Sequence, residues 1–442
     1  MLAAQNAVDL RHRLLERLAG SRRLTDELFD LVRPGSLYER PIPERHRIIF
    51  YLGHLEAFDG NLLRDRLLNL PPFHSEFDRL FAFGIDPVDG GLPSDQPSDW
   101  PSVEESRAYA QRIREQIDAE LDAALLSHSS REFPPSLLLN VAIEHRLMHA
   151  ETFAYMLHQL PLDRKRGVAR KPALLGPAVM PRMIEIPAGV ATLGLPRADA
   201  DVFGWDNEFE SQVVTVPAFA IDQFEVTNGQ YLEFMSAGGY ENRALWTEAG
   251  WNWKAEHNIS HPAFWKRAGD HWEYRTMFNE VPLPADWPVY VSHAEASAYA
   301  RWVGKVLPTE AQWHRAAYGT PEGKERLFPW GAQPPGAKFG NFNFQSWDPV
   351  PVNASPAGQS AFGVADMLGN GWEWTCSVFE PFAGFQPFSF YPGYSANFFD
   401  GRHYVIKGGS ARTAACMLRR SFRNWFQAHY QYVYAGFRCL EN

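Results

Sequence analysis

Two histidines four positions apart, His145 and His149, are the clearest candidates for chemistry in the sequence. They lie in the stretch EHRLMHAETF (144–153). Positions i and i+4 share one face of a helix, so the two imidazoles can reach one metal ion. Zinc proteases use the same spacing, but their general base directly follows the first histidine, and here that residue is Arg146. The pair indicates either a metal site without protease chemistry or two ordinary helical histidines.

A third histidine favours the metal site. His54 interrupts the apolar run YLGHLEAF, and a bundle that gathered it with His145 and His149 would offer three imidazoles to one ion. Three neutral imidazoles suit Fe, Zn, Cu or Ni and leave coordination positions open for substrate. Glu144 and Glu151 are candidates for orienting a ligand ring, or are solvated residues of the helix surface.

Four segments with helical periodicity must position these histidines. Apolar residues recur at spacings of three and four in residues 8–32, 44–68, 101–126 and 134–160. A loop rich in Pro, Gly and Asp is expected over residues 71–101. Four long amphipathic helices in a row predict a four-helix bundle.

The pattern changes after a basic, Pro-rich segment. We expect a bundle domain at 1–160, a linker at 161–181 and a second domain at 182–442. Short β-like runs and aromatic loops dominate this second domain, with helices expected at 292–304 and 309–319. The chain is therefore expected to have an α+β fold.

Composition restricts the class of protein. The net charge of −10 argues against binding to nucleic acid or to an anionic membrane. No apolar run reaches 18 residues, and the first residues have no signal-peptide core, so we expect a cytoplasmic protein. Three scattered cysteines do not form a disulfide framework, and we expect Cys376 and Cys439 to be small buried residues.

Six sequence blocks in the second domain resemble the formylglycine-generating-enzyme (sulfatase-modifying-factor) family, whose fold is C-type-lectin-like. They are EVTNGQYLEF (225–234), PVYVSHAEASAYARWVG (288–304), LPTEAQWHRAAYG (307–319), GNGWEW (369–374), KGGS (407–410) and GFR (436–438). Formylglycine generation needs two cysteines after the GGS turn. Only Cys416 is present there, so that activity is not expected.

The combination of domains resembles the ergothioneine-type sulfoxide synthases, including their selenoneine synthase branch. Their DinB-like bundle carries a distant histidine and an HxxxHxE motif, as this chain does at 145–151. The resemblance implies non-haem Fe(II) held by His54, His145 and His149, with O2 as co-substrate. It also implies two small-molecule substrates: hercynine (trimethylhistidine) and a sulfur or selenium donor that is joined to C2 of its imidazole.

The resemblance extends to residues of the second domain. In FYPGYSANFF (390–399), Tyr391 matches the family's catalytic tyrosine and Tyr394 a hercynine contact. In SFRNWF (421–426), Asn424 and Trp425 match further hercynine contacts. Aromatic rings suit a quaternary ammonium group. Without the resemblance, Tyr391 and Trp425 would be read as ordinary aromatic packing.

Three departures from the family pattern concern the substrates. Phe426 replaces the Asp that follows FRNW in synthases using γ-glutamylcysteine, and residues 81–101 lack the family's arginines. Met148 stands where the family often has Gln. We therefore expect a donor other than γ-glutamylcysteine, such as cysteine or a neutral selenosugar.

Two other classes of function stay open from the sequence. A DinB-like bundle can belong to a Zn-dependent thiol transferase that needs no O2. A lectin-like domain can belong to a ligand-binding protein that catalyses nothing. The oligomeric state, the donor, the order of substrate binding and the oxidation state of the product are not indicated by the sequence.

Overall fold

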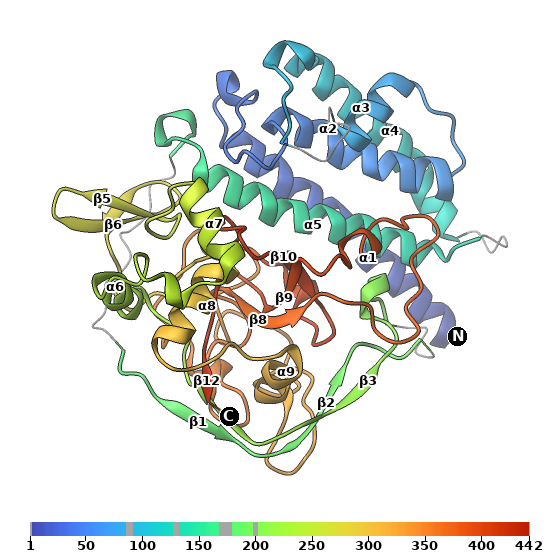
Figure 1. The fold of residues 1–442 in the computed structure, drawn as a ribbon. Helices are drawn as coiled ribbons and strands as arrows, with labels where there is room; N and C mark the ends of the chain where they lie inside the picture. The colour runs from blue at the N-terminus through green and yellow to red at the C-terminus, as the bar shows by residue number, and fades with distance from the viewer. Residues whose placement is uncertain (1, 85–91, 127–131, 168–178, 198–201, 442) are drawn as a thin grey trace. The chain divides into compact units, whose positions relative to one another are not determined.

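The computed structural model describes residues 2–84, 92–126, 132–167, 179–197 and 202–441. The chain forms two compact units, Met1–Ala169 and Arg170–Asn442 (Figure 1). Most of the predicted linker, residues 168–178, lies outside the described residues. Among the described residues, no helix has the length and apolar character needed to cross a bilayer.

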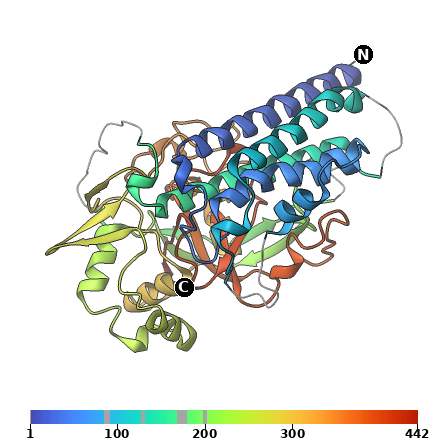
Figure 2. The ribbon, with the colours of Figure 1, turned by 90° about the horizontal axis from the view of Figure 1, so that it is seen from above.

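The first unit is helical, as predicted. Its long helices lie side by side, with α1 against α5 and α2 against α4 (Figures 1 and 2). Buried positions recur every four residues along α4 at Ile113, Ile117 and Leu121, which forms the apolar stripe that a bundle requires. The helices are α1 (Leu2–Asp30), α2 (Ile48–Asp59), which continues as a π-helical segment (Gly60–Leu67), α3 (Ser75–Phe83), α4 (Val103–Leu126) and α5 (Pro135–Gln159).

The expectation of a continuous loop over residues 71–101 is wrong, because α3 lies within it. His74 caps this helix by accepting a hydrogen bond from the Phe77 backbone N–H, and Gly84 ends it at a φ of 75°. Phe77 and Phe81 supply its apolar face. Nine residues are too short for helical periodicity to stand out beside the surrounding prolines and glycines.

The second unit combines several small sheets with four short helices among its described residues. Its sheet orders are β10-β9-β8-β11, β1-β4-β12, β2-β3 and β5-β6-β7. Its strands are β1 (Met183–Ile186), β2 (Gly189–Leu193), β3 (Gln212–Val216), β4 (Phe219–Asp222), β5 (Trp265–Ala268), β6 (His271–Arg275), β7 (Glu280–Pro282), β8 (Trp372–Val378), β9 (His403–Gly408), β10 (Asn424–Gln427), β11 (Ala435–Gly436) and β12 (Leu440–Glu441). The helices are α6 (Asn228–Ser236), α7 (Glu248–Glu256), α8 (His293–Trp302) and α9 (Glu310–Tyr318).

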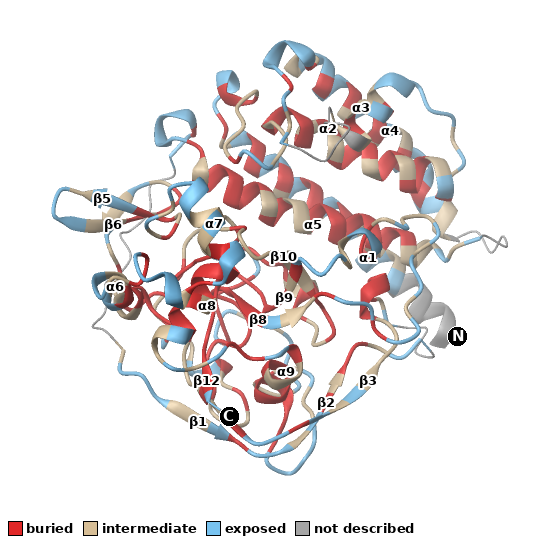
Figure 3. Cartoon of the chain, in the orientation of Figure 1, coloured by how far each residue is buried: buried red, intermediate tan, exposed pale blue. Residues whose placement is uncertain are grey.

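The expected α+β class is confirmed, and α8 and α9 match the two helices predicted in this unit. The sequence interpretation missed α6 and α7, each nine residues long. Thr227 caps α6 in a capping box with Gln230, a signal that was present in the sequence. Figure 3 shows that buried residues fill the inside of this unit.

One prediction about the cysteines is wrong. Cys439 is buried as expected, but Cys376 is exposed. The register of β8 against β9 shifts after Trp374, so the strand leaves its regular ladder where Cys376 lies. All three cysteines are free thiols.

Candidate metal centre and aromatic cluster

The three predicted histidines converge within the first unit. His54 comes from α2, and His145 and His149 from α5. Their candidate ligand nitrogens all lie within 4.8 Å of one another. The Nε2 atoms of His54 and His149 are 3.3 Å apart. Two nitrogens at bonds of about 2.1 Å to one ion are separated by about 3.0–3.4 Å at right or tetrahedral angles, so this spacing fits a shared ion.

The orientation of the His54 ring is fixed by the backbone of α3. Nδ1 of His54 lies 2.7 Å from the Phe81 carbonyl oxygen, which requires the ring to donate from Nδ1. The lone pair is therefore on Nε2, the atom nearest His149. A Cβ on Gly53 would lie 2.3 Å from the Phe81 ring, so α3 reaches this position only because residue 53 has no side chain.

Aromatic rings surround the histidines and keep them neutral. Phe58 stacks on His145 at 3.5 Å between ring centroids, and Phe50 stacks on His54 at 4.6 Å. Burial lowers the pKa of His54 to about 4, although the Phe81 hydrogen bond opposes this. Burial also lowers the pKa of His145 and His149 well below the ordinary value. Metal ions bind neutral imidazole, so the site is ready for a metal without losing protons.

The donor set fits a divalent transition metal. Three nitrogen ligands without a carboxylate suit Fe, Zn, Cu or Ni. Nδ1 of His149 has no hydrogen-bond partner among the described residues, so no partner there fixes which nitrogen of this ring carries the proton. Among the described residues, no other three His, Cys, Asp or Glu side chains bring their ligand atoms as close together.

Arg146, next to His145, belongs to a buried ionic cluster. Its guanidinium donates to both carboxylate oxygens of Glu56 at 2.8 and 2.9 Å, and to Asp59 at 2.6 Å. Although burial opposes it, Arg146 together with Arg114 holds the pKa of Glu56 at about 2. Arg146, which occupies the position of the general base in zinc proteases, thus forms ion pairs with Glu56 and Asp59 of α2.

In the second unit, three of the predicted residues form one aromatic cluster. Tyr394 lies between Tyr391 and Trp425, with ring centroids 5.5 Å from each. Trp205 stacks on Tyr394 at 4.0 Å. Burial, with the nearby Asp206 carboxylate, raises the pKa of Tyr391 to about 12, so its phenol keeps its proton near neutral pH.

The other predicted residues point elsewhere. Asn424 and Phe426 alternate with Trp425 along β10, and neighbouring strand residues face opposite sides of a sheet. The Asn424 side chain accepts a hydrogen bond from the Trp425 backbone N–H, and Phe426 stacks on Tyr430 at 5.0 Å. Met148 is half-buried on α5, one position before His149.

The sequence interpretation missed Asp206 and Asn207, which bind Ser395 in the segment that carries Tyr391 and Tyr394 (residues 390–399, the tyrosine loop). Ser395 donates a hydrogen bond to the Asp206 carboxylate, and Asn207 donates to the Ser395 hydroxyl at 3.0 Å. Burial raises the pKa of Asp206 to about 6. Asp206 and Ser395 are 189 positions apart, so no spacing pattern in the sequence could have indicated their contact. The polar stretch WDNE (205–208) was the only local sign of a site there.

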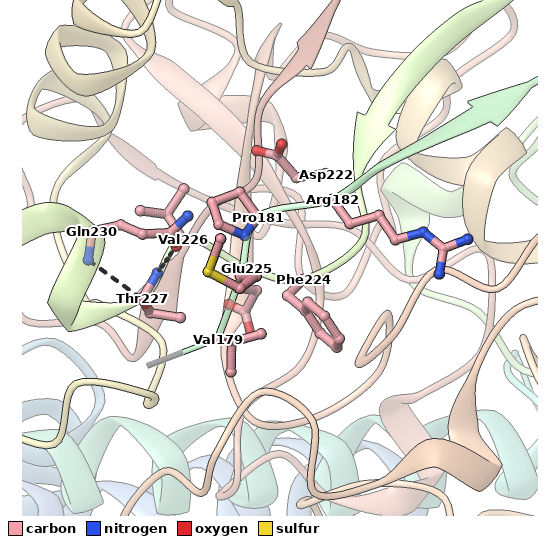
Figure 4. A pocket seen from close by; sticks show the side chains of 10 residues that line it. Val179, Pro181, Arg182, Asp222, Phe224, Glu225, Val226, Thr227 and Gln230 are labelled. Atoms are coloured by element: carbon pink, nitrogen blue, oxygen red, sulfur yellow. Dashed lines mark hydrogen bonds between the residues drawn. The ribbon is translucent and has the colours of Figure 1, made fainter. Parts of the chain in front are cut away.

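A separate pocket in the second unit is lined by Pro181, Arg182, Asp222, Glu225 and Gln230, among others (Figure 4). None of the predicted site residues lines it. Burial, with the nearby Glu373, raises the pKa of Glu225 well above its ordinary value.

Two family models match the chain. Residues 173–442 match the sulfatase-modifying factor enzyme 1-like domain, and residues 17–153 match the DinB superfamily. The chain is also similar to several curated proteins.

A protein of Mycolicibacterium smegmatis named hercynine oxygenase is 34% identical over 97% of this chain and 98% of its own length. The hercynine oxygenase of Mycobacterium tuberculosis is 42% identical, but the match covers 56% of this chain and 57% of that protein. Ergothioneine biosynthesis protein 1 of Neurospora crassa is 29% identical over 92% of this chain and 55% of its own length.

Proposed function

The chain belongs to the family of the ergothioneine-type sulfoxide synthases, and we propose that it is an O2-dependent non-haem Fe(II) enzyme that joins sulfur or selenium to C2 of the hercynine imidazole. The observation that carries the proposal is the convergence of His54, His145 and His149 within 4.8 Å. Bound Fe(II) would supply O2 activation and hold the reacting partners together.

The residues of the chain have separable tasks. The three neutral imidazoles hold the ion and leave positions for ligands. The aromatic cluster of Tyr391, Tyr394, Trp425 and Trp205 supports binding of a trimethylammonium group, which is attracted to ring faces. Burial raises the pKa of Tyr391 to about 12, so its hydroxyl stays protonated near neutral pH and has a proton or hydrogen atom to give.

The reaction balances with one O2. Replacing the C2 hydrogen of hercynine by the chalcogen of a thiol or selenol removes two electrons. Oxidising the new thioether or selenoether to its oxide removes two more. O2 accepts all four, with one oxygen atom in the product and the other in water.

We propose that the donor differs from γ-glutamylcysteine. Phe426 stacks on Tyr430 where an Asp could have held an amino group. No arginine lies between residues 81 and 101 to hold a carboxylate. Cysteine or a neutral selenosugar fits this lack of charge better.

The proposal is tested by aerobic incubation of Fe(II)-loaded protein with hercynine and, in turn, cysteine, γ-glutamylcysteine, a thiosugar and a selenosugar. Mass spectrometry should detect a hercynine adduct with at least one donor. A Zn-loaded, anaerobic sample is the matched control and should give none. Adduct formation in that control would instead favour a Zn-dependent thiol transferase, and no adduct with any donor would overturn the proposal.

A further inference from the structure

Two helices supply the three histidines, so their alignment decides the geometry of the site. His54 lies on α2, and His145 and His149 on α5. When a helix shifts its register by one residue, each side chain is replaced by one that lies about 1.5 Å further along the axis and about 100° around it. Metal–ligand distances tolerate only about ±0.2 Å. Some contact between α2 and α5 must therefore fix their register.

Arg146 makes one contact of this kind. It directly follows His145 on α5, and its partners Glu56 and Asp59 lie two and five positions after His54 on α2. The guanidinium also donates to the Leu55 carbonyl at 3.1 Å. All three charged side chains are about 1–2% exposed. A planar guanidinium fork that meets several acceptors at once restricts how the two helices can be aligned.

We propose that Arg146, Glu56 and Asp59 form a charge clamp that sets the register of α2 against α5 and so positions the three imidazoles around their metal ion. This inference rests on the proposed metal site. The guanidinium of Arg146 is bound to Glu56 and Asp59, and a guanidinium has no lone pair to offer a metal ion. Arg146 is a positioning residue.

A purely stabilising role is the competing explanation. Buried ion pairs are weak evidence for stability, since apolar replacements of similar volume are often as stable. Their best-attested use is to fix register. The two explanations therefore predict different results when all three residues of the clamp are replaced by apolar ones. If the clamp sets the register, stability should recover but the metal geometry should not.

The test uses the full chain and Co(II), which reports coordination by its visible absorption. R146M should weaken the apparent Co(II) affinity by about 10- to 100-fold and change the spectrum, as changes behind metal ligands do. R146K keeps the charge but loses the fork, so it should recover only part of the affinity. In the triple variant R146M/E56M/D59L, Arg114 loses Glu56 but keeps its hydrogen bonds to Asp26, and Arg22 loses Asp59 but keeps its bond to Asp118. This variant should therefore regain thermal stability relative to R146M while its Co(II) affinity and spectrum stay altered.

Arg438→Met is the matched control. Arg438 is fully buried in the second unit and donates twice to Glu373 at 2.6 Å. R438M should lower the melting temperature without changing the Co(II) affinity. If the triple variant binds Co(II) with the wild-type affinity and spectrum, the clamp does not position the site. If the wild-type chain itself binds no metal, the proposed function fails instead.

Discussion

The Nε2 atoms of His54 and His149 lie 3.3 Å apart, although 95 positions separate the two residues in the chain. These two half-buried imidazoles can form a hydrogen bond only if His149 carries its proton on Nε2, because Nδ1 of His54 already donates to the Phe81 carbonyl. A shared ion satisfies both lone pairs at once. The spacing is the structural basis of the proposed metal centre.

Removing any one ligand should remove the metal. We expect H54A, H145A and H149A to lower the bound iron or cobalt to less than about a tenth of the wild-type amount, because two imidazoles hold a divalent ion far more weakly than three. Metal analysis of the purified proteins measures this. His12, exposed on α1, gives the control H12A. A full complement of iron in H145A would disprove the ligand assignment.

The Gly53–Phe81 contact should matter for the metal as well as for stability. In G53A the new methyl would lie 2.3 Å from the Phe81 ring, which displaces the carbonyl that orients His54. We expect a loss of about 1–3 kcal/mol in the free energy of unfolding from overpacking, together with weaker Co(II) binding.

The matched control for this change is G20A. Gly20 lies within α1, and a Cβ there meets only the end of the Arg23 side chain at 3.7 Å. Replacing a helical glycine that has room should stabilise the protein by about 0.5–1 kcal/mol. Equal Co(II) affinity in G53A and G20A would contradict the proposed role of the Phe81 carbonyl.

The stability of the metal-free protein should depend on the charge state of His54. Burial lowers its pKa to about 4, below the ordinary value of about 6.5 expected in the unfolded chain. The unfolded chain therefore binds more protons between these values, and stability should fall as the pH drops from about 6.5 to about 4. Melting temperatures of wild type and H54Q at pH 7.5 and pH 5 measure this. An equal loss in both proteins would argue against a neutral His54 in the folded protein.

Metal binding should resist mild acid for the same reason. Since folded His54, His145 and His149 are neutral at pH 6, protons do not compete for them there. We expect Co(II) affinity to stay within about threefold between pH 7.5 and pH 6, whereas three histidines with ordinary pKa values of about 6.5 would lose much more.

The tyrosine loop should affect turnover without affecting the metal. Y391F removes the hydroxyl proposed to act in the reaction and should lower kcat by at least about 100-fold. S395A removes the hydrogen bonds to Asp206 and Asn207 and should lower kcat less, by misplacing the loop. Both variants should bind Co(II) as wild type does. Full turnover in Y391F would exclude Tyr391 from the chemistry.

The sequence was sufficient to predict the long helices and the three histidines. Long amphipathic segments have a periodicity that assigns each residue to a face, so the convergence of His54 with His145 and His149 followed from the bundle. The short helix α3 was missed, and with it the contact that orients His54. That contact uses a backbone carbonyl, which any residue at position 81 could supply.

Other parts of the site depend on pairings that no local pattern contains. Arg146 was recognised as an unusual neighbour of His145, but its partners lie about 90 positions away on α2. Asn424 and Trp425 were both expected to contact hercynine from adjacent positions. The strand β10 alternates their directions, and only Trp425 joins the aromatic cluster with Tyr394.

The most direct test of the central claim follows the hydrogen at C2 of hercynine. Fe(II)-loaded wild-type protein is incubated aerobically with C2-deuterated hercynine and, in turn, cysteine, γ-glutamylcysteine, a thiosugar and a selenosugar. The masses of the products are measured by mass spectrometry. The account predicts a donor adduct that has lost the deuterium, and neither adduct nor deuterium loss with H145A. Hercynine recovered with its C2 deuterium intact, or an adduct that retains the deuterium, would contradict it.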